Sequence, residues 1–448
     1  MQENKTVRIW VTSALLTVLI ALYGVWIITE APSYWETFLF VTLMLLLLAV
    51  AIIRFVPYAI TYVATGKEPH LERVGERTFR RCGTRELFRV VLWILILRLA
   101  LMLLTYVMHY AQFGYTETFF RVQRIWLDFY HPETSFPAYP LLSNVFWFVS
   151  FNFNHARFLA SYLFTGLAGA MLYYWVLLDF DRYVARHAVL CFFLLPAACL
   201  LLGTLPDTLF LMLSMMCLVF ARKRRFLLSN LFAMLAVTTH LLGLLLFVPV
   251  IIEYTEMLRD DLRNHREESK GYLLHQILPA ASFLLIPLGF VIVLLYSDIQ
   301  FGTPTSLIRT AQEWYGYHPS LPFSSLAKLS DRFFEALRTA NGDVLKYELG
   351  NTIPNLFYVL LGVLLLIAAP GRIRTSYIAY LAVTYLAVLC VGNLLETPRV
   401  LTMCAPFVLT LTLTVRKKWQ FYAVSVVSFG LMLFYLWAVV GGYTIYSA

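Results

Sequence analysis

The stretch IWVTSALLTVLIALYGVWIIT occupies residues 9–29 and carries no charged side chain. An apolar run of about 20 residues matches the length that an α-helix needs to cross a bilayer. It is too long for the core of a signal peptide and no small-residue cleavage site follows it, so we expect a retained helix. Similar runs recur along the 448 residues, of which 60% are hydrophobic and 14% charged. Because lipid admits only helices and closed barrels, and these runs are too long for barrel strands, the sequence predicts an all-α polytopic membrane protein.

The apolar runs also set the expected domain organisation. Two runs and a basic loop make up residues 1–88, which we interpret as an N-terminal addition to a transmembrane core at 89–448. Several runs in the middle of the chain are short, which is typical of tilted or broken helices. Taking each run as one helix predicts about thirteen spans, at residues 9–29, 36–57, 89–108, 157–179, 188–203, 206–221, 226–240, 241–257, 276–296, 353–369, 375–393, 398–415 and 420–441.

The net charge of +9 indicates a membrane topology and not a nucleic-acid partner. Lys and Arg gather in short loops between apolar runs, as the positive-inside rule requires. The clusters lie at 58–88, 222–225, 259–270, 372–374 and 416–418. All of them are cytoplasmic if the N-terminus lies inside and the Trp- and Phe-containing segment 141–153 rests on the outer surface as an interfacial helix. The segments then expected outside are the loops 109–156 and 297–352 and the turns 204–208 and 396–399.

The common metal-binding, nucleotide-binding and catalytic motifs are absent from the sequence. The six cysteines show no CxxC pair and no metal-ligand spacing, so we expect free thiols. No GxGxxG, Walker, HExxH or GxSxG motif is present. The polar residues near the expected outer ends of the helices are therefore the candidates for a site.

One of the largest polar segments expected outside is HYAQFGYTETFFRVQRIWLDFYHPETSFPAYP at 109–140. It contains Trp126, Asp128, His131 and Glu133 close together. Carboxylates beside aromatic side chains at a membrane interface suit general-base or metal-assisted chemistry on a sugar or a phosphate. The alternative interpretation is a solvated loop with ordinary surface charges.

Two proline-containing elements follow along the chain. In FPAYP at 136–140, each proline follows an aromatic residue, and we expect a rigid non-helical corner that includes Tyr139. Such a corner is either architectural or part of a site. Asp207 follows Pro206 at the expected start of a helix, where a carboxylate serves either as an N-terminal cap or as a functional group at the membrane boundary.

His240 and Arg399 complete the set of candidates. His240 lies between two apolar runs, and Arg399 begins another. Arginine at the outer end of a helix is a natural ligand for a phosphate or pyrophosphate, because its donors form a planar fork. The alternative for Arg399 is a side chain that reaches to lipid headgroups.

In this order the elements resemble the GT-C superfamily of membrane glycosyltransferases. They are most similar to the family of the second mannosyltransferase of GPI-anchor assembly (PIG-V type) and its bacterial relatives. That family has a Trp-Asp in its first outer loop, and here Trp126-Leu-Asp128 is the nearest candidate, looser by one residue. Its later elements are Phe-Pro-Leu-Tyr-Pro, Tyr-Thr-Glu-Ser-Leu-Phe, Thr-Arg-x-x-Gly and Pro-Arg-Tyr. The similar stretches here are Phe136–Pro140, Leu205–Phe210 with Asp207 for Glu, Thr239–Gly243 with His240 for Arg, and Pro398–Val400.

The resemblance implies an inverting transfer on the outer face of the membrane, in a bacterial plasma membrane rather than the endoplasmic reticulum. The donor would be a polyprenyl-phosphate sugar, such as mannose, and the acceptor a lipid or a glycan. Asp128 or Glu133 would activate the acceptor hydroxyl, and Arg399 would hold the donor phosphate. His240, Asp207, Tyr139, His131 and Trp126 would line the substrate site. Whether a divalent cation takes part is left open.

Two other functions stay open on the sequence alone. One is a flippase or transporter of a lipid-linked saccharide, which would need ionisable residues in mid-helix along a path across the membrane. We expect the charges at helix ends on one side, and we find no internal repeat, which favours the enzyme. The other is a catalytically inactive GT-C-like protein that binds lipid-linked sugar, because the family's Trp-Asp is not matched directly.

Overall fold

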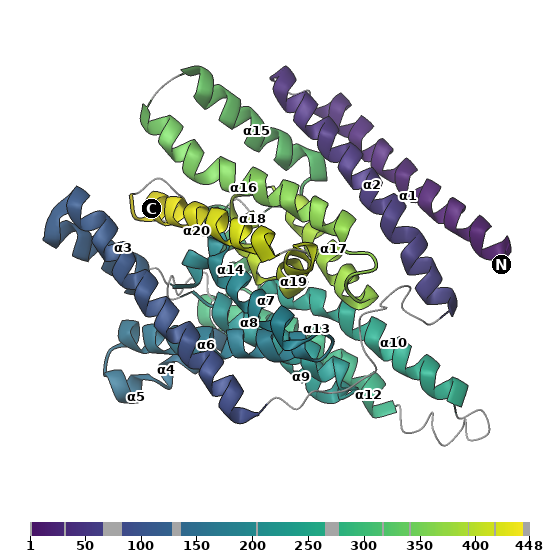
Figure 1. Ribbon diagram of the computed structural model, residues 1–448, viewed down its shortest axis with the longest axis horizontal. Coiled ribbons are helices and arrows are strands. Elements are labelled where there is room, and N and C mark those ends of the chain that lie inside the picture. The colour runs from purple at the N-terminus through teal and green to yellow at the C-terminus, as the bar shows by residue number, and fades with distance from the viewer. Residues whose placement is uncertain are drawn as a thin grey trace. The chain divides into compact units, whose positions relative to one another are not determined.

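The structure is a computed structural model that describes residues 2–30, 33–65, 83–127, 136–202, 205–264, 277–315, 318–339, 342–392, 394–415 and 418–441 (Figure 1). Across these ranges the regular structure is helical, and the one β pairing is an isolated bridge between Pro319 and Val391. The all-α prediction is therefore confirmed.

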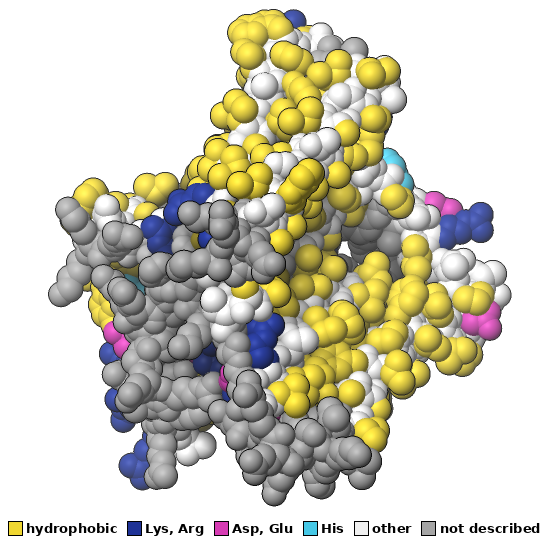
Figure 2. Space-filling view, turned by 90° about the vertical axis from the view of Figure 1, so that its right-hand side faces the viewer, with side chains coloured by type: hydrophobic (Ala, Val, Ile, Leu, Met, Phe, Trp, Pro, Cys, Tyr) yellow, Lys and Arg dark blue, Asp and Glu magenta, His cyan; other side chains and the backbone are white. Residues whose placement is uncertain are grey.

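The chain is an integral, multi-pass membrane protein. Within the described ranges, eight helices are long and apolar enough to cross a membrane. They cover Thr6–Thr29, Trp35–Thr65, Thr84–Met108, Phe153–Leu177, Leu241–Leu262, Ile277–Phe301, Val344–Ala368 and Trp419–Gly441. Figure 2 shows that hydrophobic side chains cover much of the described surface on that face, with few charges among them. Such a surface is suited to lipid and not to water.

The expected number of about thirteen spans is not confirmed, because several apolar runs are divided. The run at 188–203 forms a short helix followed by the 3₁₀ helix Pro196–Leu202. The run at 398–415 is divided at Cys404, whose extended backbone separates two helices. The second helix begins at Ala405, and Pro406 lies in its first turn, where no backbone N–H is needed.

The contacts gather into two compact units, and neither is a continuous piece of chain. Unit 1 contains residues 1–72, 312–418 and 441–448, and unit 2 contains residues 73–311 and 419–440. The boundary expected at residue 88 was based only on the order of apolar runs and basic loops, and it stays a prediction.

Unit 1 is built from the long helices α1 (Gln2–Thr29), α2 (Trp35–Thr65) and α16 (Gly342–Ala368) and from four shorter ones. The shorter helices are α15 (Pro322–Thr339), α17 (Thr375–Leu389), α18 (Thr397–Met403) and α19 (Ala405–Thr414), and α14 (Ser306–Tyr315) crosses the unit boundary. The core forms where α16 meets α17 and α19. Tyr358 stacks on Phe407 with ring centroids 5.8 Å apart, and Tyr385 donates its hydroxyl hydrogen to the Val359 carbonyl at 2.9 Å.

Unit 2 is centred on α6 (Phe153–Leu177) and α8 (Asp207–Arg222), whose residues are mostly buried. Around them lie α3 (Thr84–Leu127), α4 (Ala138–Asn144), α5 (Trp147–Ser150), α7 (Arg182–Leu194), α9 (Phe226–Val237), α10 (Phe247–Asn264), α12 (Ile277–Ala281), α13 (Leu285–Phe301) and most of α20 (Lys418–Gly441). The 3₁₀ helices Leu241–Leu246 and Ser282–Leu284 join these elements. Gly169 of α6 lets Ile94 of α3 approach so closely that an added Cβ would lie 2.2 Å from its Cδ1.

The segment after the third span differs from expectation. We expected loop structure from residue 109, but α3 continues to Leu127. Its backbone is interrupted at Gly114, which has φ 74° and ψ 178°, a conformation that suits glycine. From there to Leu127 the sequence holds no proline or further glycine, so a helix is permitted although the segment is polar.

The segment 141–153 forms two short helices where we expected one. Helix α4 ends at Asn144 and α5 spans only Trp147–Ser150, so neither is long enough to cross a membrane. Phe151 has a positive φ of 51°, and the Asn152 side chain accepts the backbone N–H of Asn154 to cap α6. The expectation that this segment does not span is consistent with these lengths.

Polar contacts within each unit join segments that the expected topology assigns to the same side. On the side expected to be cytoplasmic, unit 2 has the ion pairs of Arg222 with Asp179 at 2.9 Å and of Arg224 with Asp260 at 2.8 Å. On the side expected to be outside, the Ser33 N–H of unit 1 donates to Asp331 at 3.2 Å. These contacts are compatible with the alternation of sides inferred from the basic loops.

Candidate functional site

Three of the expected site residues lie outside the described residues. These are Asp128, His131 and Glu133, and their roles stay predictions. Trp126 belongs to α3, but the structure describes only its backbone. The part of the site that can be built therefore consists of Tyr139, Asp207, His240 and Arg399 with their surroundings.

The proline element at 136–140 is partly helical and not the non-helical corner we expected. Helix α4 begins at Ala138, and Pro140 falls in its first turn, where a missing N–H costs no hydrogen bond. The Ala138 N–H donates to the carbonyl of Thr238 at 3.0 Å. Tyr139 is fully buried, and its hydroxyl donates to the Arg157 carbonyl at 3.3 Å. These bonds attach the element to the end of α9 and to α6.

His240 occupies the turn between α9 and the following 3₁₀ helix. Its backbone is extended, and its Nδ1 accepts the Leu242 N–H at 3.2 Å. Because Nδ1 accepts, the proton of a neutral His240 ring must reside on Nε2. Phe210 of α8 lies against the imidazole with ring centroids 5.4 Å apart. The ring is thus oriented by its own turn and by α8.

Gly243 explains why this turn can pack so tightly. A Cβ at this position would lie 2.4 Å from the backbone nitrogen of Val237, closer than real Cβ atoms approach. The 3₁₀ helix therefore returns directly over the end of α9 only if residue 243 has no side chain. This steric requirement is a physical reason for the glycine in Thr239–Gly243.

Asp207 is the first residue of α8 and is fully buried. The residue at the cap position is Pro206, and no side chain provides the cap there. Asp207 is therefore not the cap, which was one of its two alternatives, but lies one position later in the first turn, where the helix dipole favours a carboxylate. One turn further along, Phe210 contacts His240, so α8 brings this turn to the same region as the His240 element.

Sequence reasoning did not single out Arg98 of α3, a charged residue that is fully buried. Its guanidinium donates to the Ser161 carbonyl at 2.6 Å and to Thr165 Oγ1 at 2.5 Å, both on α6. Its guanidinium carbon also lies 5.1 Å from the centroid of the Tyr162 ring. Arg98 thereby connects α3 with α6.

Arg98 corrects the expectation that charges lie only at helix ends. It is the one charged residue in the run at 90–108, so the signal was present in the sequence. An ionisable residue in the middle of a span is by default a candidate for function, since its burial is costly. What the sequence did not indicate was its orientation toward α6.

Arg399 lies in unit 1, in the first turn of α18. Its Nη1 pairs with Glu396 Oε1 at 2.7 Å, and the two side chains are 11% and 8% exposed. The Thr397 N–H at the start of the same helix donates to Asn355 Oδ1 of α16 at 3.1 Å. A buried amide and a buried carboxylate therefore fix the helix end that carries the arginine.

The substrate site implied by the resemblance includes both Arg399 and Asp207, which belong to different units, so their joint role stays a prediction. Within unit 2, in contrast, three of the sequence elements come together: the α4 element, the first turns of α8 and the His240 turn. Among the described residues, no group of three or more His, Cys, Asp or Glu side chains could hold a metal ion. The carboxylates expected to be available for a cation belong to the segment outside them.

Comparison of the chain with family models and with curated proteins gives no match.

Proposed function

We propose that this protein is a glycosyltransferase of the GT-C type, acting at the outer face of a bacterial plasma membrane. It would move a sugar, with mannose as the first candidate, from a polyprenyl phosphate to a hydroxyl of a lipid or glycan acceptor. The observation that supports the proposal most is the gathering of the α4 element, the Asp207 helix start and the His240 turn in unit 2. These stretches lie far apart in the sequence, and each resembles a family element.

The reaction assigns a role to each group. A carboxylate, Asp128 or Glu133, takes the proton of the acceptor hydroxyl while its oxygen attacks the anomeric carbon. The bond from that carbon to the phosphate oxygen breaks on the opposite face, and the configuration inverts. The negative charge leaves on the polyprenyl phosphate, where a guanidinium such as that of Arg399 stabilises it.

The buried charge at Arg98 supports a second candidate function. A mid-span cation bonded to hydroxyl and carbonyl groups is expected along the path of an anionic substrate in a transporter. A flippase of a lipid-linked saccharide would use Arg98 in translocation and would break no glycosidic bond. The two functions therefore differ in whether the sugar leaves its phosphate.

The test uses the full chain in nanodiscs with a radiolabelled polyprenyl-phosphate mannose and a short mannoside acceptor. We expect labelled acceptor from the native protein, and loss of transfer in Asp128→Asn or Glu133→Gln. Arg399→Lys should weaken donor binding, because the charge remains but the fork is lost. Arg372→Lys is the matched control, since Arg372 is a half-exposed arginine of the same unit on the side expected to be cytoplasmic.

Donor that crosses the bilayer of proteoliposomes with its sugar still attached would instead favour the transporter. Transfer from a nucleotide sugar in the absence of any prenyl phosphate would contradict the proposed donor class.

A further inference from the structure

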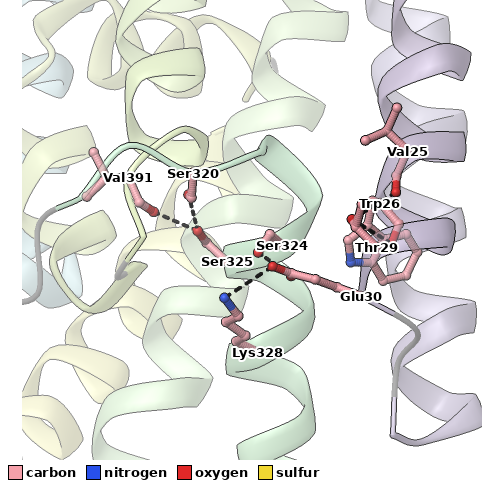
Figure 3. Close-up of polar contacts among 9 residues, drawn as sticks. All are labelled: Val25, Trp26, Thr29, Glu30, Ser320, Ser324, Ser325, Lys328 and Val391. Carbon is pink, nitrogen blue, oxygen red and sulfur yellow. Dashed lines mark hydrogen bonds and ion pairs between the residues drawn. The ribbon is translucent and has the colours of Figure 1, made fainter.

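The first turn of α15 joins two parts of unit 1 that are distant in sequence. On one side it contacts the hairpin formed by α1 and α2, and on the other it contacts the chain that leads to Arg399. Figure 3 shows Glu30 at the end of α1 next to Ser324 and Lys328, while the adjacent Ser325 is bonded to Ser320 and Val391. The consecutive residues Ser324 and Ser325 thus contact the two different parts of the unit.

The hairpin side of this junction combines a ring cluster with charged groups. Tyr23 and Trp26 of α1 pack on Phe323 with centroids 5.7 and 6.5 Å apart, and both Trp26 and Phe323 are buried. One turn beyond Trp26, the Glu30 carboxylate accepts the hydroxyl hydrogen of Ser324, and Lys328 Nζ lies 3.4 Å from it. Successive turns of α1 thus bind one short segment of α15.

The same hairpin continues along one face of α15. The Ser33 N–H donates to Asp331, and Glu36 pairs with Arg338 at 3.0 Å. With Ser324 and Lys328, these α15 residues follow helical spacing, so they share one side of the helix. The contact at Glu36 is at the far end of α15 and provides a matched comparison with Glu30.

The other side of the junction holds the chain before α18. Ser325 Oγ donates to the Val391 carbonyl at 2.8 Å and lies 2.6 Å from Ser320 Oγ. The Ser320 N–H donates to the Cys390 carbonyl at 2.9 Å, and the Gly392 N–H donates to the His318 carbonyl at 2.7 Å. The chain then leads through the 3₁₀ helix Leu394–Glu396 into α18. A displacement of the first turn of α15 would therefore move the segment that begins with Val391.

We infer that the N-terminal hairpin is a positioning element for Arg399, and that Glu30 is its positioning residue. The hairpin holds the first turn of α15 through Glu30, and that turn holds the chain that places Arg399. This inference deepens the proposed function and rests on it, because it assigns Arg399 to the donor phosphate. It also gives a role to two helices that lie outside the family resemblance.

The test compares Glu30→Ala with Glu36→Ala in the full chain in nanodiscs. The first readout is hydrogen–deuterium exchange in peptides that contain Ser320 or Gly392. We expect Glu30→Ala to raise exchange there about tenfold and to weaken binding of polyprenyl-phosphate mannose by about threefold to tenfold, because a partly exposed charged hydrogen bond is lost. Glu36→Ala should leave both quantities near native values.

Three further variants keep the outcome decisive. Glu30→Gln retains an oxygen for Ser324 and should restore native exchange. Ser324→Ala removes the same hydrogen bond from α15, should raise exchange as Glu30→Ala does, and replaces Glu30→Ala if that variant does not fold. Arg399→Ala tests the proposed function separately. If Arg399→Ala weakens donor binding but Glu30→Ala leaves exchange at Gly392 unchanged, the inference is wrong and the proposed function stands. If Arg399→Ala has no effect on binding, the proposed function fails, and with it the link from Glu30 to the donor.

Discussion

Breaking the pair between Arg399 and Glu396 should destabilise unit 1 in a way that a double substitution partly repairs. The two side chains meet at 2.7 Å and are 11% and 8% exposed, so each would leave a nearly buried charge if its partner were removed. At an effective dielectric constant of 20, two unit charges 4 Å apart attract by about 4 kcal/mol. Measured losses on removing one member of a buried pair are about 3–5 kcal/mol.

From these figures we expect Arg399→Ala and Glu396→Ala each to lower the free energy of unfolding by about 3 kcal/mol. The double variant should lose less than the sum, with a coupling energy of about 2 kcal/mol. The reason is that a single substitution leaves a nearly buried charge without its 2.7 Å partner, whereas the double substitution removes both charges. Arg399→Lys should fall between native and Arg399→Ala, since it keeps the charge and loses the fork geometry.

The assay is reversible unfolding in mixed micelles, followed by tryptophan fluorescence for the four proteins of the cycle. Arg372→Ala is the control; its Nη1 lies 3.1 Å from Thr414 Oγ1, and its loss should change stability by less than about 0.5 kcal/mol. Additive losses in the cycle would refute the idea that Glu396 holds Arg399. If the coupling is present, the double variant is the folded protein in which loss of donor binding can be assigned to the guanidinium itself.

Gly243→Ala should lower the free energy of unfolding by about 2 kcal/mol, and with it the melting temperature, because the new Cβ would meet the backbone of Val237. A native melting curve would refute the steric argument. Arg98→Ala should lower the free energy of unfolding by about 3 kcal/mol, because it leaves a cavity and removes hydrogen bonds. Arg98→Met fills the cavity and should recover part of that stability; equal melting temperatures of the two variants would show that the cavity contributes nothing. The hydrogen bond from Ser324 lowers the pKa of Glu30 below its ordinary value of 4.5, so its stabilising contribution is present above that pH and is lost as the pH falls through the folded pKa. Glu30→Gln should therefore reduce the loss of stability seen in acid titrations below pH 4.5, and an unchanged titration would count against the contact.

The helical architecture was predictable because the apolar runs are long and the basic residues lie between them. The sequence was less informative about where individual helices end or break. The extension of α3 past Gly114 was missed, since a polar segment without proline can be helix or loop. The division at Cys404 was missed because the run at 398–415 is apolar on both sides of the break.

For the candidate site, the sequence predicted the start of a helix but not the contacts between segments that are distant in the chain. The position of Asp207 at the start of a helix was predicted, and α8 begins there. The hydrogen bond between Ala138 and Thr238 was not predictable, because it joins two backbone groups that any residues could supply. Arg98 was visible as a charge in an apolar run, but its bond to the Ser161 carbonyl depends on how α3 and α6 pack.

The contact between Glu30 and Ser324 has a consequence for how the chain is made. The two residues are separated by 294 positions. At about 5–20 residues per second, a ribosome needs roughly 15–60 s to synthesise that interval. Helices α1 and α2 are both complete early in this interval, but the helix that binds their connection does not yet exist. Unit 1 therefore cannot be completed until residues 73–311 of unit 2 have been synthesised.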